Sequence, residues 1–128
     1  MNDSKNPLSP HLQIYRWQIS SLISIIHRIT GILNFLGLIF ISVWISSAGI
    51  SENLFEYFSI FFKSFIGRFI LIGFTWSISY HLLSGIRHLF WDLGYGYEIK
   101  TANFSGILVI LSSLILTIVL WIIGKGLI

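Results

Sequence analysis

The sequence predicts an all-α membrane protein whose three long helices cross the bilayer. Of its 128 residues, 55% are hydrophobic and only 10% are charged, whereas a soluble domain carries about 25% charged residues. Residues 29–51 and 101–124 contain no charged side chain, and residues 64–86 contain one. Each stretch supplies the roughly 20 apolar residues that a spanning helix needs. A barrel strand would instead show about 10 residues of alternating polarity.

The chain is therefore expected to form one membrane domain, 1–128, with spans at about 22–48, 64–90 and 104–125. The breaks between them, near 47–53 and 92–98, are polar and rich in turn-forming residues. Residues 1–20 lack the apolar core and small-residue cleavage site of a signal peptide.

The distribution of lysine and arginine predicts the orientation. Five of these residues fall at one boundary and three at the other: Lys5, Arg16, Arg28, Arg87 and Lys100, against Lys63, Arg68 and Lys125. Because positive residues concentrate on the inner side, the N-terminus is expected on the cytoplasmic or matrix side.

Composition also excludes several functions. The chain has no cysteine, so it holds no disulfide, thiolate zinc site or iron–sulfur cluster. It has no phosphate-binding glycine loop and no dinucleotide fingerprint. Its net charge of +3 is small and scattered, so membrane lipid is expected as a partner and nucleic acid is not. Any flavin or nicotinamide chemistry must belong to another polypeptide.

Polar residues recur along one face of the first span. Spacings of three and four residues join Ser20, Ser24, His27, Gly31 and Asn34, with Arg28 at the edge. One interpretation is close helix packing, with Arg28 extending to the membrane boundary. The other is a polar cavity at the inner end, where Ser24 hydrogen-bonds a carbonyl and Arg28 holds an anionic or carbonyl oxygen.

The second span carries His81, Gly85 and His88 on one face. The two histidines would lie about 10 Å apart along a helix, whereas two nitrogen ligands of one metal lie only about 4 Å apart. If a haem is bound, only one of them ligates its iron, and the opposing ligand comes from elsewhere. His81 is the better candidate because it lies deeper, where neutral imidazole is favoured. Gly85 would leave room for a flat macrocycle or a helix. The alternative is that His81 only hydrogen-bonds a neighbouring helix.

Basic groups are predicted to gather at the inner boundary, where negatively charged haem propionates would lie. These groups are His27, Arg28, Arg87 and His88.

Three blocks of this sequence together resemble a known family. They are 7–15 (PLSPHLQIY), 24–31 (SIIHRITG) and 81–94 (HLLSGIRHLFWDLG). In order and spacing they are similar to the cytochrome b membrane-anchor subunits of succinate dehydrogenase, respiratory complex II. The resemblance extends from Pro7 into the third span. One departure is Asn6 before Pro7, where the family commonly has arginine. It lies in the segment 1–20, which the resemblance implies is used for docking.

The resemblance implies a bundle of three transmembrane helices that pairs with a second, smaller three-helix anchor. Iron–sulfur and flavoprotein subunits would dock on the inner face. A haem b would lie between the two anchors with one axial histidine from each, here His81, and with His27 and His88 near its propionates. Ser24 and Arg28 would line part of the ubiquinone pocket. The chain would lie in a bacterial or mitochondrial inner membrane. A purely structural anchor, or a subunit of a quinol–fumarate reductase, remains the alternative.

Overall fold

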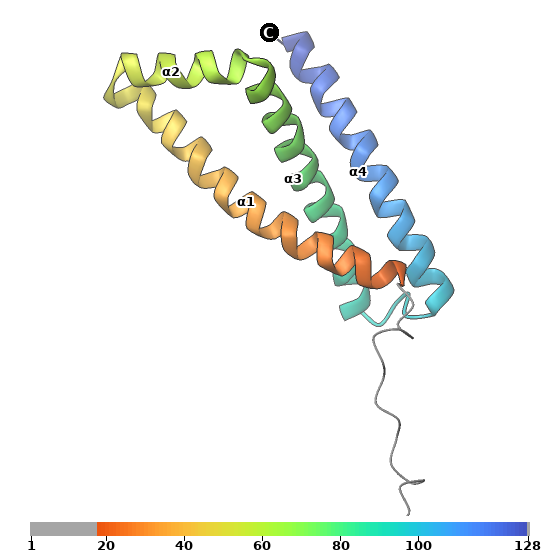
Figure 1. The fold of residues 1–128 in the computed structure, drawn as a ribbon. Coiled ribbons are helices and arrows are strands. Elements are labelled where there is room, and N and C mark those ends of the chain that lie inside the picture. Colours follow the sequence, from red (N-terminus) through yellow and green to blue (C-terminus); the bar gives the residue numbers. More distant parts are fainter. Residues whose placement is uncertain (1–17, 128) are drawn as a thin grey trace, which may run out of the picture.

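The computed structural model describes residues 18–127, with side chains described up to Lys125. Within this part the chain forms four α-helices and no strand (Figure 1). They are α1 (Ile19–Ile50), α2 (Glu52–Lys63), α3 (Phe65–Asp92) and α4 (Ile99–Leu127).

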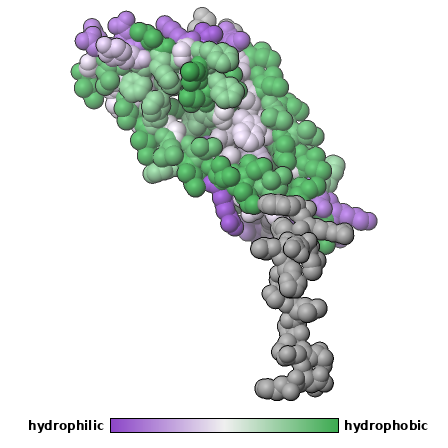
Figure 2. Space-filling model, viewed as in Figure 1, coloured by the Kyte–Doolittle hydropathy of each residue, from purple (hydrophilic) through white to green (hydrophobic). Residues whose placement is uncertain are grey.

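The three predicted spans correspond to the long helices α1, α3 and α4. Each is long and apolar enough to cross a membrane, and each extends at one or both ends a few residues beyond its predicted limits. Their large hydrophobic side chains are mostly exposed, and Figure 2 shows an apolar surface along the length of the bundle. A surface of this kind suits hydrocarbon as the surrounding solvent.

The helices converge at one end of the bundle. There the start of α1 lies beside the end of α3 and the start of α4, while α1 and α3 diverge toward α2 (Figure 1). The small buried core lies at this convergence and joins one residue from each long helix: Ile23, Tyr80 and Val109. This end corresponds to the predicted inner boundary.

The segment between the first two spans is not the simple polar break that the sequence predicted. It contains α2, which runs across the other end of the bundle (Figure 1). Ser51 caps the helix, its side chain accepting from the Leu54 amide at 3.5 Å. Phe55 and Phe62 of α2 pack on Trp44 of α1, with ring centroids 6.2 and 4.8 Å apart. The alternation of aromatic and polar residues at helical spacing is the signal for this amphipathic helix.

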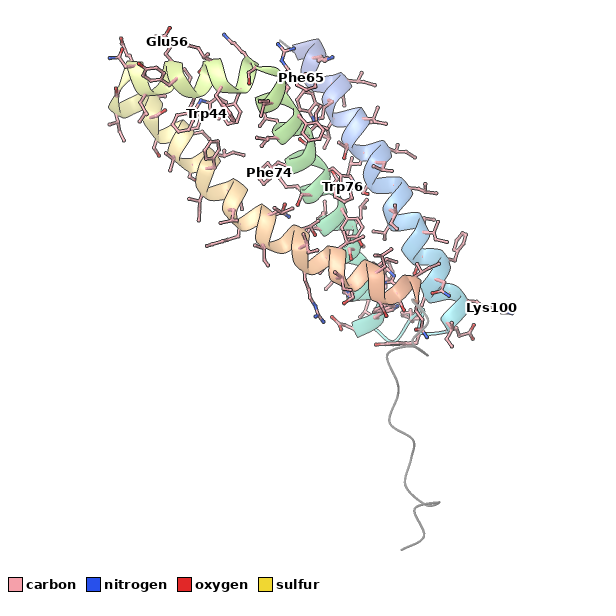
Figure 3. All side chains as sticks on the ribbon, viewed as in Figure 1. Trp44, Glu56, Phe65, Phe74, Trp76 and Lys100 are labelled. Atoms are coloured by element: carbon pink, nitrogen blue, oxygen red, sulfur yellow. The ribbon has the colours of Figure 1, made fainter. Side chains whose placement is uncertain are left out.

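Hydrogen bonds between side chains connect the long helices. Trp76 of α3, labelled in Figure 3, donates to Ser113 of α4 at 3.2 Å. Ser77 of α3 donates to the Asn34 side chain of α1 at 2.7 Å. Because the hydrophobic effect does not drive helices together within lipid, such bonds and close packing hold membrane bundles together.

The space between the diverging α1 and α3 contains a cavity of about 690 Å³ with an almost wholly apolar lining. Phe74 of α3 is one of the residues that line this cavity, and its ring points toward α1 (Figure 3). The ring occupies the place where a Cβ on Gly37 would lie. Gly37 therefore provides the contact point for this ring on α1.

Candidate functional site

Three histidines meet where α1 and α3 converge. The rings of His27 and His81 are stacked, with centroids 4.0 Å apart and planes inclined by 6°. His88 approaches His27 edge-on, with a centroid separation of 5.2 Å. The structure thus brings together the three histidines that the helical spacing assigned to polar faces.

The His81 ring is held by α1 through its Nδ1 atom. This nitrogen lies 3.2 Å from the His27 carbonyl oxygen and 3.3 Å from Thr30 Oγ1. A carbonyl oxygen can only accept a hydrogen bond, so Nδ1 carries the ring proton in this arrangement. Nε2, the other ring nitrogen, is then left with a free lone pair.

The two glycines of the site have different surroundings. A Cβ on Gly31 would lie 3.2 Å from His81 Cε1, so the missing side chain lets the imidazole approach the α1 backbone. A Cβ on Gly85 would meet nothing within 4 Å. No described part of this chain packs against Gly85, and the face of α3 is open there.

His27 has an unusual environment. Its Nδ1 atom is buried and has no hydrogen-bond partner within the described residues. A buried polar group without a partner is uncommon in folded proteins. A group from outside this chain is the simplest way to satisfy the donor or acceptor.

Ser24 and Arg28 lie on α1 within one turn of His27. Ser24 is half-buried and Arg28 is exposed. Their spacing of four residues places them on the same face of the helix. Arg28 is therefore accessible beside the histidine cluster, and Ser24 is partly accessible there.

Arg87 lies beside His88 at the predicted inner boundary, but its hydrogen bonds go to α4 and not to the histidines. Its side chain is 6% exposed and turns to α4, where it donates to Ser105 Oγ and the Ala102 carbonyl, each at 2.9 Å. Its guanidinium also lies over the Trp91 ring, 3.9 Å from the centroid. Successive residues on a helix point about 100° apart. Arg87 therefore reaches α4 while His88 approaches His27, although both side chains contact the Trp91 ring.

Two residues that the sequence did not single out also shape the site. Thr30 contacts His81, as described above, and also donates to the His27 carbonyl at 2.9 Å. Tyr80, fully buried, donates to the Ile23 carbonyl of α1 at 3.0 Å. The position of Thr30 three residues after His27, on the same helix face, is the signal that was available for it.

The donor set fits a haem iron better than a metal ion held by this chain alone. No group of three or more metal-ligating side chains occurs in the described part of the chain. The stacked rings of His27 and His81 cannot point their nitrogens at one metal. His81 could offer Nε2 as a single imidazole ligand, because its other nitrogen donates to a carbonyl, which is the usual arrangement for a metal-binding histidine. Beside it, Gly85 offers open space.

Comparison with known proteins matches residues 2–120 to the model of one family, described as succinate dehydrogenase/fumarate reductase transmembrane subunit. The chain is 42% identical over 119 residues to a Rickettsia prowazekii protein named succinate dehydrogenase cytochrome b556 subunit, covering 93% of both chains. A Paracoccus denitrificans protein of the same name is 41% identical over 118 residues, covering 92% of this chain and 91% of its own. A succinate dehydrogenase cytochrome b560 subunit from Reclinomonas americana is 37% identical over 122 residues, covering 91% and 85%.

The family match spans most of the chain, including all of α1 and α3 and most of α4. The relatives agree with it over nearly their full lengths. The fold of three apolar helices is the one expected for a transmembrane subunit. The chain belongs to the succinate dehydrogenase/fumarate reductase transmembrane subunit family.

Proposed function

We propose that this chain is the membrane anchor that holds haem b and part of the ubiquinone pocket in a succinate dehydrogenase. The observation that carries the proposal is the orientation of His81, whose Nδ1 is bound to α1 and whose Nε2 is free. The names of the relatives favour succinate oxidation over fumarate reduction, because each of those compared is called a succinate dehydrogenase subunit.

In this proposal His81 would hold the haem iron from this chain, and a second, smaller anchor subunit would supply another histidine. His27, Arg28 and His88 would hold the propionates, and Gly85 would leave room for the macrocycle. The group would supply a one-electron carrier within the membrane. The buried, unpartnered Nδ1 of His27 supports this placement, since a propionate or a water bound to it would satisfy that atom.

Ser24 and Arg28 would act on the quinone itself. A neutral quinone accumulates negative charge on its oxygens as it gains electrons, before protons arrive. A fixed cation and a hydroxyl donor directed at those oxygens stabilise that charge. Arg28 is suited to this role because its guanidinium is accessible and presents several N–H donors in a fixed geometry. Ser24, on the same face, would donate a hydrogen bond to a quinone carbonyl.

Succinate oxidation would take place on partner subunits. This chain has no cysteine for iron–sulfur clusters, so a flavoprotein and an iron–sulfur subunit are required at the inner face. Residues 1–17, which include most of the expected docking segment, lie outside the described residues. The complex would lie in a bacterial or mitochondrial inner membrane, with the converging end of the bundle on the cytoplasmic or matrix side.

The haem assignment is tested with His81→Ala and His88→Ala in the purified complex. Loss of the b-type absorption band is expected for His81→Ala alone, since His88 is assigned to the propionate side and not to the iron. A full band in the His81 variant, or its loss only in the His88 variant, would show that the ligand has been misassigned.

The quinone assignment is tested by Arg28→Leu, with Arg68→Leu as the matched control at the opposite end of the bundle. The Arg28 variant is expected to lose succinate–ubiquinone reductase activity while the soluble subunits still reduce an artificial dye. The control should keep both activities. Normal quinone turnover without the Arg28 guanidinium would exclude it from the pocket.

A further inference from the structure

The hydrogen bonds around His81 can be assigned one proton at a time. The Thr30 hydroxyl donates its only hydrogen to the His27 carbonyl at 2.9 Å. Its oxygen still has lone pairs, and it lies 3.3 Å from His81 Nδ1. The His27 carbonyl lies 3.2 Å from the same nitrogen. One Nδ1–H therefore faces two acceptors, and distances slightly above 3 Å are those expected for a shared hydrogen bond.

Three further features hold the ring in this position. Thr30 is 1% exposed, so water does not compete for its oxygen. The His27 ring covers one face of the imidazole at 4.0 Å. Gly31 allows the ring edge to approach α1, with 3.2 Å between His81 Cε1 and the place where a Cβ would lie. The side chains and backbone of one turn of α1, residues 27–31, therefore determine how the α3 imidazole is presented.

We propose that Thr30 is a positioning residue for the haem ligand. Together with the His27 carbonyl it accepts a hydrogen bond from Nδ1–H of His81, which fixes the tautomer, the ring orientation and the basicity of Nε2. This inference rests on the proposed haem function. It adds that α1, the same helix that carries Ser24 and Arg28, sets the orientation of the ligand on α3.

The expected consequence follows from how outer hydrogen bonds act on a metal ligand. An acceptor at the distal nitrogen makes an imidazole a stronger electron donor, and removing such a partner typically weakens metal binding about 10- to 100-fold. A stronger donor favours ferric over ferrous iron, so loss of the acceptor raises the reduction potential. Haem retention, the electron paramagnetic resonance spectrum of the ferric iron and the midpoint potential all report on this bond without measuring turnover.

The test compares Thr30→Val with Thr30→Ser in the complex purified in mild detergent. Valine keeps the branched shape and removes the hydroxyl, whereas serine keeps the hydroxyl. The valine variant should lose haem at least about tenfold more readily, with shifted ferric resonance positions and a higher midpoint potential. The serine variant should match the wild type. Thr117→Val is the control, because it removes a buried hydroxyl that bonds only its own helix, at the Ser113 carbonyl.

The outcomes separate this inference from the proposed function. Wild-type complex without haem would overturn the proposed function itself. Wild-type complex with haem, and a valine variant whose haem content, resonances and potential are unchanged, would overturn only the role of Thr30. Equal changes in the serine and valine variants would also overturn it, because the methyl group and not the hydroxyl would then matter. If the valine variant does not assemble, Thr30→Ala takes its place with the same readouts, and unchanged haem there likewise counts against the proposal.

Discussion

Replacing Arg87 tests whether this residue holds α3 and α4 together or belongs to the haem environment. In Arg87→Met the side chain keeps an unbranched apolar stem but loses two hydrogen bonds to α4 and the contact of the guanidinium with Trp91. Each hydrogen bond from a charged donor contributes roughly 1.5–3 kcal/mol, and the cation–π contact roughly 0.5–2 kcal/mol. Methionine also removes the cost of burying a charge, several kcal/mol. A net loss of about 2 kcal/mol, or roughly 30-fold in the unfolding equilibrium, is therefore expected.

The loss is measured by titrating the detergent-solubilised protein with a denaturing detergent and following tryptophan fluorescence. Arg87→Lys is the informative companion. Lysine keeps the cost of burying a charge but cannot span both acceptors and stack on the ring, so it should destabilise at least as much as methionine. The haem spectrum should stay unchanged in both variants. An altered haem spectrum with unchanged stability would refute the reasoning. It would indicate that Arg87 acts at the histidine cluster.

Two further substitutions test how the helices are held together. In Gly67→Ala the new Cβ would collide with the Phe61 carbonyl oxygen, a backbone atom that cannot rotate away. The expected cost is about 1–3 kcal/mol, whereas Gly73→Ala on the same helix meets nothing within 4 Å and should be neutral or slightly stabilising. Equal stability of the two variants in the same titration would contradict the tight α2–α3 corner. In Tyr80→Phe the bond to the Ile23 carbonyl disappears, and a loss of about 0.5–1.5 kcal/mol is expected. An unchanged midpoint would mean that this bond does not join α1 to α3.

The helical spacing predicted the histidine cluster but not all of its surroundings. Residues three, four or seven apart share a face in any helix, so His81 and His88 had to lie on one side of α3. That this side meets His27 is a tertiary fact, seen in the stacked rings. The contribution of Thr30 was missed for the same reason, because a threonine in an apolar helix has no chemical signature until its neighbour is known.

Arg87 shows most directly that the sequence does not predict which helix a side chain contacts. In the sequence it is adjacent to His88, and both were expected at one basic cluster. In the structure both contact the Trp91 ring, but Arg87 donates its hydrogen bonds to α4 whereas His88 approaches His27 of α1. The helix α2 is a second example, because a 12-residue segment is too short to be identified by hydropathy as a span, and its aromatic face has meaning only against Trp44.

The sequence by itself determined that three helices cross the membrane and which residues share each helix face. It could do so because backbone groups in hydrocarbon must be bonded within their own segment, which leaves the helix and its fixed period as the only choice. Only the tertiary structure decided which faces meet, that α1 holds the Nδ1 side of His81, and that Arg87 is used by α4. Helix contacts depend on side chains from distant parts of the chain, and no local pattern encodes them.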